Sequence, residues 1–295
     1  MHVIQVNNLS KSYKGTTALR QVSFNVPKGS VFGILGPNGS GKSTLLGLIL
    51  GVLQSDAGSY SWFNQGNHAD LRRRIGALLE KPNFYPNMTA LNNLKLIAMI
   101  RGVEKSEIYE AMDIVELMDK CEAKYKTFSY GMKQRLAIAA TLIGNPEVLI
   151  LDEPTNGLDP QGIADIRDLI SKIARDGTTI ILASHMLSEI EKVCSHVMIL
   201  KKGSKIIDTN LSDLQNSKDR VITITIDETD KFVEYVQQES TVSVHSSDTK
   251  NVKVNLSADV QPKDFMKKVY DAGFEPSNFQ VEHMNLEQFY LESVK

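Results

Sequence analysis

A glycine-rich stretch near the start of the chain, "GPNGSGKST" at residues 36–44, has the residue types that bind phosphate. It fits the pattern G-x-x-x-x-G-K-[ST], follows the apolar run "VFGIL" and opens the helical run "LLGLIL", which is the context of a phosphate-binding loop. Glycines let backbone N–H groups turn toward phosphate oxygens, and the helix dipole adds to the attraction. A chance glycine-rich turn is the alternative. The residues expected around the phosphates are Gly36, Pro37, Asn38, Gly39, Ser40, Gly41, Lys42, Ser43 and Thr44.

Four side chains supply the expected chemistry of a nucleoside triphosphatase. Lys42 is expected to bridge β- and γ-phosphates, while the hydroxyl of Ser43 ligates Mg²⁺. The apolar run "EVLILDEP" ends in Asp152 and Glu153. Asp152 is placed to hold Mg²⁺, directly or through water, and Glu153 to polarise a water for attack on the γ-phosphate. A turn or helix cap is the alternative interpretation of this acidic pair.

His185 follows another apolar run, "TTIILAS". A histidine at the carboxyl edge of a parallel sheet faces the crevice in which ligands bind. We therefore expect His185 to hydrogen-bond the γ-phosphate or the attacking water, although a histidine at a strand end also serves structural roles.

The elements that position these groups alternate between strand and helix up to about residue 203. Nearly continuous apolar runs at 31–35, 147–152, 178–184 and 196–200 suit strands buried on both faces of a mainly parallel sheet. Helical patterns at 42–50, 160–175 and 187–194 lie between or beside them, which predicts an α/β core. The alternating runs "HVIQV" and "VSFNV" predict an antiparallel β piece near the start.

Residues 86–143 interrupt this alternation with three helical segments and no strand, which predicts a helical subdomain inserted into the core. Its last helix begins at "FSYGMKQR", with Ser129 as a good N-cap residue. Gly131 lies in the first turn, where it costs about 1 kcal/mol relative to Ala, and Met132 leaves no capping box. Such a bare helix start indicates the approach of an anion.

The chain changes character after Gly203, and 211–218 is the expected junction. Strand and helix patterns from residue 220 onward follow the order βαββαβ, which predicts a small ferredoxin-like α+β domain at 220–295 with a short final helix. Residues 1–215 form the other expected domain.

Composition limits the classes of function. Of the 295 residues, 42% are hydrophobic and 23% charged, and the formal net charge is −2; this balance offers no basic footprint for nucleic acid. Cys121 and Cys194 have no partner in metal-ligand spacing and indicate a reducing compartment. No signal peptide or membrane span is expected, so the chain is predicted to be cytosolic, with any membrane role supplied by a partner.

Taken in order, these motifs resemble those of ATP-binding-cassette (ABC) ATPases over about residues 3–215. The motifs that carry the resemblance are Tyr13, "GPNGSGKST", a strand ending near Glu80, "FSYGMKQR", "LILDEP", "NGLD" and "ASH". The resemblance implies a P-loop cassette fold with a mainly parallel sheet core, an antiparallel β subdomain and a helical subdomain. It also implies hydrolysis of ATP with Mg²⁺, and Tyr13 as the aromatic residue that stacks on adenine, unless Tyr13 merely packs at a strand edge.

The resemblance further implies a head-to-tail dimer. The signature residues Ser129, Tyr130, Gly131 and Met132 of one protomer would cap the γ-phosphate held by the other, and Asp159 of the "NGLD" segment would reach across the interface. Whether a homodimer or a heterodimer with a paralogue forms is left open by the sequence.

Two motifs depart from the usual family pattern. Glu80 stands where the family has a glutamine near Mg²⁺, and it keeps the capacity to ligate the ion. Tyr130 and Met132 replace the usual Gly and Gln of the signature. Both departures resemble the branch associated with bacterial export of, and immunity to, peptide antibiotics such as bacitracin and lantibiotics.

The leading hypothesis is therefore the ATPase subunit of an exporter, peripheral on the inner face of the cell membrane through separate membrane subunits. The segment "NFYPNM" is a candidate for docking such a subunit, and packing on its own domain is the alternative. Two other hypotheses are an ABC ATPase acting on DNA or the ribosome, and a regulatory cassette that uses ATP as a dimerisation switch.

Overall fold

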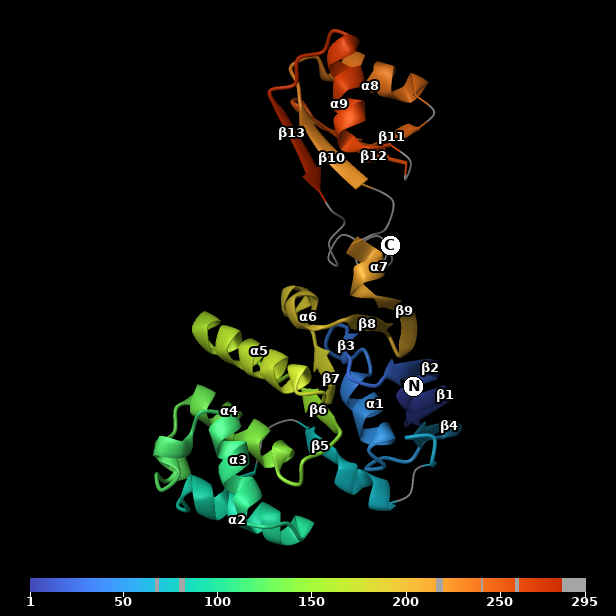
Figure 1. Ribbon diagram of the computed structural model, residues 1–295. Coiled ribbons are helices and arrows are strands. Elements are labelled where there is room, and N and C mark those ends of the chain that lie inside the picture. Colours follow the sequence, from blue (N-terminus) through green and yellow to red (C-terminus); the bar gives the residue numbers. More distant parts are fainter. Residues whose placement is uncertain (67–68, 80–82, 216–219, 240, 258–259, 283–295) are drawn as a thin grey trace. The chain divides into compact units, whose positions relative to one another are not determined.

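The computed structural model describes residues 1–66, 69–79, 83–215, 220–239, 241–257 and 260–282. It divides into two compact units, Met1–Asn210 and Leu211–Lys295 (Figure 1). The first unit therefore ends earlier than the expected limit at residue 215. The expected junction at 211–218 begins with a short helix, α7 (Leu211–Gln215), which belongs to the second unit.

The main sheet of the first unit has the strand order β5-β6-β7-β3-β8-β9. All neighbouring pairs are parallel except β8 and β9. Every residue of β3, β6 and β7 is buried, as expected of strands covered on both faces. The strands are β3 (Val31–Leu35), β5 (Ile75–Leu78), β6 (Val148–Asp152), β7 (Thr179–Ser184), β8 (His196–Lys201) and β9 (Ser204–Asn210).

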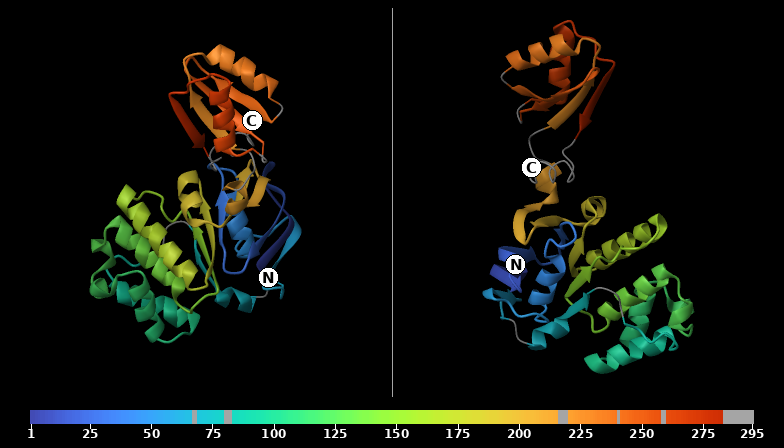
Figure 2. Two further views of the ribbon diagram at one scale, coloured as in Figure 1. Left: turned by 45° about the horizontal axis from the view of Figure 1, so that its top comes forward. Right: turned by 180° about the vertical axis from the view of Figure 1, so that it is seen from behind.

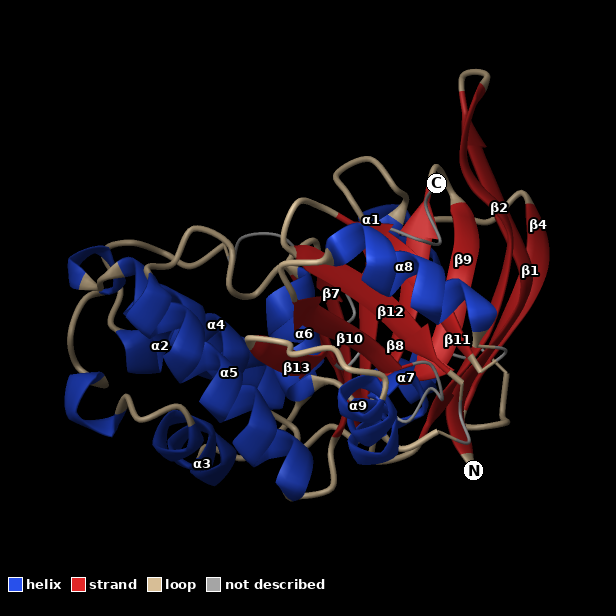
Figure 3. Cartoon of the chain, turned by 90° about the horizontal axis from the view of Figure 1, so that it is seen from above, coloured by secondary structure: helices blue, strands red, loops and turns tan. Residues whose placement is uncertain are grey.

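A separate antiparallel sheet is built from β1 (His2–Tyr13), β2 (Thr16–Pro27) and β4 (Ala57–Trp62), in the order β2-β1-β4 (Figure 3). The helix α1 (Lys42–Ile49) contributes its apolar side chains to one core with this sheet and one face of the main sheet. Burial of these side chains, at about 25 cal/mol per Å² of apolar surface, holds the helix in place. The phosphate-binding loop that precedes α1 thus rests on a packed core.

The opposite face of the main sheet is covered by α5 (Pro160–Arg175) and α6 (Leu187–Val193). Gly33 in β3 allows α6 to come close, because a Cβ at this residue would lie 2.9 Å from Cγ2 of Ile190 and 3.0 Å from Sγ of Cys194. Burial raises the pKa of the Cys194 thiol far above its ordinary value, so Cys194 acts as a packed apolar group.

The described residues between β5 and β6 contain three α-helices: α2 (Ala90–Arg101), α3 (Ser106–Ile114) and α4 (Tyr130–Leu142). They lie together at one side of the unit (Figure 2), with the short 3₁₀ helices η2 (Met118–Lys120) and η3 (Tyr125–Thr127) between α3 and α4. Gly76 in β5 admits the backbone of α4, because a Cβ there would collide with the carbonyl oxygen of Thr141. A further 3₁₀ helix, η1 (Ala69–Arg74), contains the basic run Arg72–Arg74.

The second unit has a four-stranded antiparallel sheet in the order β11-β12-β10-β13. The chain order β10-α8-β11-β12-α9-β13 is the βαββαβ order expected from the sequence. Apolar side chains from the sheet, α8 and α9 make its core. The bounds are β10 (Arg220–Thr225), α8 (Thr229–Gln238), β11 (Val242–Ser247), β12 (Asn251–Leu256), α9 (Pro262–Asp271) and β13 (Asn278–Glu282). The expected final helix lies outside the described residues.

No helix among the described residues is both long and apolar enough to cross a lipid bilayer. Within the same residues, no group of three or more His, Cys, Asp or Glu side chains is arranged to hold a metal ion.

Candidate active site

The candidate catalytic groups meet because β6, β7 and β3 are neighbours whose carboxyl ends share one edge of the sheet. The phosphate-binding loop leaves β3, Asp152 ends β6, and His185 follows β7. Two backbone hydrogen bonds fix the registers: the N–H of Gly36 donates to Ser184 O at 3.3 Å, and the N–H of Glu153 donates to Ala183 O at 2.9 Å. The structure thus brings together residues from 36 to 185 at the place where α/β sheets bind ligands.

Lys42 is a buried charge in this group, with a side chain only 6% exposed. Its ammonium donates to the carbonyl oxygen of Gly36 at 2.7 Å and lies 3.3 Å from Oε1 of Glu153. A buried ammonium is costly unless it is paired in this way. Lys42 is therefore held in front of the loop with its charge directed at the position where an anion is expected.

Glu153 lies between Lys42 and His185. Its second carboxylate oxygen, Oε2, accepts a hydrogen bond from Nδ1 of His185 at 2.8 Å, which places a proton on that nitrogen. The backbone of Glu153 has a φ of 49°, a left-handed conformation that costs a non-glycine residue on the order of 1 kcal/mol or more. Strained residues persist where the surroundings hold them, and they concentrate at functional sites.

The conformation of the phosphate-binding loop depends on close backbone approaches. Gly41, the residue before α1, has a φ of 109°, and a Cβ there would lie 2.6 Å from the carbonyl oxygen of Ala18. A Cβ at Gly203 would lie equally close to the same oxygen. Ala18 also lines the cavity of about 230 Å³ at the loop, with residues 38–44 and Glu153. Ala18 was not predicted from the sequence, because the residue belongs to no motif and makes these close approaches through its backbone carbonyl group.

Ser43 and Asp152 supply two oxygen donors side by side. The hydroxyl of Ser43 donates to Oδ2 of Asp152 at 2.8 Å, and Asp152 is only 5% exposed. Both residues line a second cavity, of about 430 Å³, with Glu153, Asn83, Tyr130, Gln134 and Asn156. Hydroxyl and carboxylate oxygens are the hard ligands that Mg²⁺ prefers, and Mg²⁺ commonly takes only one or two carboxylates from a protein. The residues present therefore fit the expected ion.

The signature residues form the start of α4. Ser129 is its N-cap, and the hydroxyl oxygen accepts a hydrogen bond from the N–H of Met132 at 3.2 Å. This corrects the expectation of a bare helix start: Met132 is not part of a capping box, but its amide is satisfied by Ser129. Gly131 faces open space, since the nearest atom to a Cβ built there is Cδ2 of Leu158 at 3.9 Å.

A groove of about 480 Å³ joins this helix start to the start of α5. Ser129, Tyr130, Gly131 and Met132 line one part of the groove, and the other part is lined by Gly157, Leu158, Asp159, Gln161 and Gly162. Asp159 caps α5, accepting from the N–H of Gly162 at 2.8 Å. Asp159 thus has a role in its own chain, beside the expected role at an interface.

Tyr130 is 43% exposed, and its hydroxyl donates to the backbone carbonyl of Asn156 at 3.1 Å. Its ring lies beside Gly157, where an added Cβ would be 3.4–3.5 Å from the ring and hydroxyl atoms. This contact joins the signature helix to the loop between β6 and α5. Sequence reasoning placed Tyr130 only among the signature residues and did not identify Asn83, Gln134 or Asn156 as residues of the site.

Tyr13 is the residue expected to stack on adenine. Tyr13 ends β1, is 44% exposed, and has the ammonium of Lys11 5.4 Å from its ring centroid. It does not line the cavity at the phosphate-binding loop. Glu80 lies outside the described residues.

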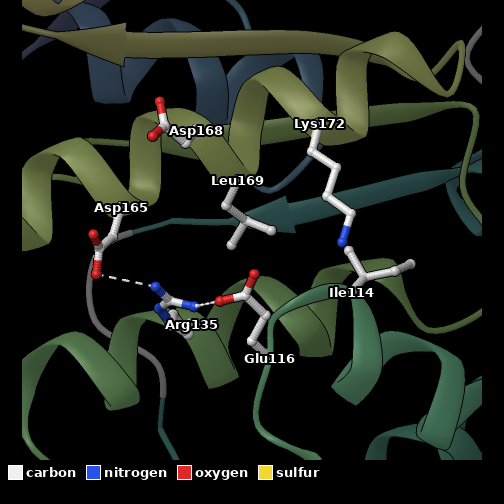
Figure 4. A pocket seen from close by; sticks show the side chains of 7 residues that line it. All are labelled: Ile114, Glu116, Arg135, Asp165, Asp168, Leu169 and Lys172. Carbon is white, nitrogen blue, oxygen red and sulfur yellow. Dashed lines mark hydrogen bonds and ion pairs between the residues drawn. The ribbon is translucent and has the colours of Figure 1, made fainter.

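A charged cluster around Arg135, the last residue of the "FSYGMKQR" segment, joins α4 to α5 (Figure 4). Arg135 pairs with Glu116 at 2.8 Å and with Asp165 of α5 at 3.0 Å. Hydrogen bonds from Gln161 and from Arg135 hold the pKa of Asp165 below its ordinary value. The adjoining cavity, of about 230 Å³, shares no lining residue with the cavities at Lys42 and Asp152. We interpret this cluster as a connection between helices.

Comparison with known proteins tests the predicted family assignment. A model described as "ABC transporter" matches residues 19–156, and an AAA-domain model matches residues 122–191. The chain is 41% identical to the ABC transporter ATP-binding protein YhcH of Bacillus subtilis (strain 168), covering 81% of this chain and 76% of YhcH. The chain belongs to the ABC transporter ATP-binding proteins. The predicted family and cassette fold are confirmed.

Two further relatives carry more specific names. The bacitracin transport ATP-binding protein BcrA of Enterococcus faecalis is 40% identical, over 72% of this chain and 71% of BcrA. The lantibiotic transport ATP-binding protein SrtF of Streptococcus pyogenes is 39% identical, over 72% of this chain and 93% of SrtF. The branch that Glu80, Tyr130 and Met132 suggested is therefore represented among the relatives.

Solved structures of ATP-binding cassettes are similar in fold to this chain. The ADP conformation of the ATP-binding cassette MJ1267 matches with a TM-score of 0.67 and 26% identity, over 72% of this chain and 94% of that chain. A dimeric post-hydrolysis state of the cassette MJ0796, bound to ADP and Pi, matches with a TM-score of 0.64 and 28% identity, over 70% and 98%. This ABC protein is an ATPase that binds ATP through its cassette.

Proposed function

We propose that this ABC protein is the ATPase subunit of a bacterial exporter for peptide antibiotics, acting with separate membrane subunits on the inner face of the cell membrane. The observation that carries the catalytic part is the contact of Glu153 with both Lys42 and His185, at 3.3 and 2.8 Å. The similarity to BcrA and SrtF supports the exporter part.

In this proposal, Lys42 binds the β- and γ-phosphates, with the backbone N–H groups of residues 36–44. A phosphate beside Lys42 competes with Glu153 for the ammonium and so releases the carboxylate to accept a proton from a water. The Nδ1–H bond keeps His185 oriented, leaving Nε2 for the γ-phosphate or the water. The reaction is hydrolysis of ATP to ADP and phosphate.

Mg²⁺ is the cofactor that Ser43 and Asp152 would hold. When bound, the ion neutralises charge on the phosphates. The protein contributes two ligand oxygens, Oγ of Ser43 and Oδ2 of Asp152, which lie 2.8 Å apart where the fully buried strand β6 ends.

Ser43→Ala tests this assignment. The substitution removes one donor of the pair, and we expect the Mg²⁺ concentration for half-maximal ATP hydrolysis to rise by roughly 10- to 100-fold, the range seen when a contact that supports a metal is lost. The measurement is a Mg²⁺ titration of hydrolysis at saturating ATP. Ser171→Ala, whose hydroxyl only bonds Arg167 O within α5, is the control. An unchanged Mg²⁺ requirement for Ser43→Ala would contradict the assignment.

Two surfaces suit the proposed assembly. The groove between the starts of α4 and α5 contains the signature residues and Asp159, as a head-to-tail pair requires, and the MJ0796 cassette forms a dimer. The segment after residue 82 offers a second surface: Asn93 binds the backbone of Tyr85 at 2.8 and 3.2 Å, while the Tyr85 side chain is 61% exposed. A loop whose backbone is held by Asn93 and which exposes an aromatic side chain suits docking of a membrane subunit.

The exporter role is tested with the membrane proteins encoded beside this chain. We expect the purified complex in lipid vesicles to hydrolyse ATP faster when bacitracin or a lantibiotic is added, and cells that carry the operon to tolerate higher concentrations of that antibiotic than cells with Lys42→Ala. The proposal fails if the chain hydrolyses ATP neither alone nor with those membrane proteins. Hydrolysis with no response to either peptide would instead refute the assigned substrate class.

A further inference from the structure

The loop between β6 and α5 carries both the candidate catalytic carboxylate, Glu153, and Asp159, the residue expected at the dimer interface. It begins at Glu153 and ends at Asp159, the N-cap of α5. Pro154 and Thr155 are buried, whereas Asn156 and Gly157 are exposed. Asn156 and Gly157, in the middle of this loop, are therefore without cover from the core.

Within the loop, the position of Glu153 is linked to Asn156 by a tight turn. The N–H of Asn156 donates to the carbonyl oxygen of Glu153 at 3.1 Å, and the N–H of Leu158 donates to Thr155 O at 3.3 Å. A movement of the Asn156 peptide is thus transmitted to Glu153, whose own backbone is held at a φ of 49°. Such a conformation needs support from its surroundings.

Tyr130 supplies support from outside the loop. Its hydroxyl donates to Asn156 O at 3.1 Å, and its ring lies against Gly157, which has a φ of 78°. Tyr130 is the first residue of α4, so the contact connects the signature helix to the turn behind Glu153 in the same chain. Tyr130 also lines the cavity that contains Ser43, Asp152 and Glu153.

We infer that Tyr130 is a positioning residue for Glu153: it fastens the exposed part of the catalytic loop to the head of the signature helix, and so couples the placement of that helix to hydrolysis in its own chain. This inference rests on the ATPase activity proposed for Glu153. On this inference, the Tyr130 side chain points toward the loop of its own chain and makes contacts there that a glycine at this position cannot make.

Tyr130→Phe removes the hydroxyl and keeps the ring. We expect kcat for ATP hydrolysis to fall by about three- to tenfold, the range that corresponds to one lost neutral hydrogen bond, while the KM for ATP changes by less than about twofold. The side chain is 43% exposed, so the fold should tolerate the change. Tyr109→Phe on α3, also 43% exposed, is the matched control and should leave both constants unchanged.

A second comparison separates positioning from direct contact with nucleotide. If Tyr130 acts through Glu153, adding Tyr130→Phe to Glu153→Gln leaves the residual turnover unchanged. Amide hydrogen exchange of residues 153–158 should also be faster in Tyr130→Phe than in the wild type. The inference is overturned if kcat of the single variant is unchanged, if KM rises instead of kcat falling, or if the double variant loses further activity.

The activity of the wild type distinguishes a failure of the positioning role from a failure of the proposed function. Failure of the wild type to hydrolyse ATP would refute the ATPase mechanism itself. Normal hydrolysis in both the wild type and Tyr130→Phe would refute only the positioning role.

Discussion

Glu153→Gln is expected to lower kcat for ATP hydrolysis by about 10²- to 10⁴-fold, the contribution typical of a general base. The amide keeps the size of the side chain but loses the basic oxygen that accepts a proton. Lys42 and the glycine-rich loop remain, so the affinity for ATP should be preserved or increased, because the substitution also removes the carboxylate that lies 3.3 Å from the Lys42 ammonium.

The measurement combines single-turnover hydrolysis with ATP binding at equilibrium. Glu234→Gln, on the exposed side of α8, is the matched control and should behave as the wild type does. A Glu153→Gln variant that keeps more than half of the wild-type kcat would rule out Glu153 as the base, and a parallel loss of ATP binding would indicate damage to the phosphate site.

The core of the cassette is predictable because burial on both faces leaves a clear pattern. Uninterrupted apolar runs became β3, β6 and β7, and the polar residues that follow each run mark the edge where the site lies. The lateral order β6-β7-β3 is not readable in this way. Lys42, Glu153 and His185 were assigned individually, but their mutual contacts depend on that order.

Elements with weaker patterns were missed for physical reasons. The strand β4 has mostly exposed or half-buried residues, "AGSYSW", and β9 lies at the edge of the main sheet, so neither needs a continuous apolar run. The contacts of Ala18 O with the loop and of Tyr130 with Asn156 O involve backbone acceptors. Every residue carries a carbonyl group, so the side-chain sequence gives no sign of which carbonyl is used.

Gly131→Asp is the second substitution with a large expected effect: loss of ATP-driven dimerisation, with ATP binding by the monomer retained. If the start of α4 caps a phosphate of the partner protomer, the new carboxylate meets a like charge there. Two unit charges about 4 Å apart repel by about 4 kcal/mol at an effective dielectric constant near 20, which is roughly a thousandfold in an association constant.

The chain itself should accept this substitution. A Cβ at Gly131 meets only Cδ2 of Leu158, at 3.9 Å, and a negative charge in the first turn of a helix is favoured by the dipole by about 0.3–1 kcal/mol. We therefore expect the thermal stability of the monomer to be unchanged or slightly raised. The same charge that stabilises α4 alone would then prevent dimerisation, a combination that general misfolding cannot produce.

Gly131→Asn is the matched control, because it has the size of Asp without the charge. We expect it to weaken ATP-driven dimerisation less than Gly131→Asp does, and raising the salt concentration should narrow the difference between the two, since salt screens repulsion. The measurements are light scattering with and without ATP, and nucleotide binding by the monomer. Equal losses of dimerisation and monomer binding in Gly131→Asp would show that the start of α4 supports its own nucleotide site, and the assignment of this helix to the phosphate of a partner would then be wrong.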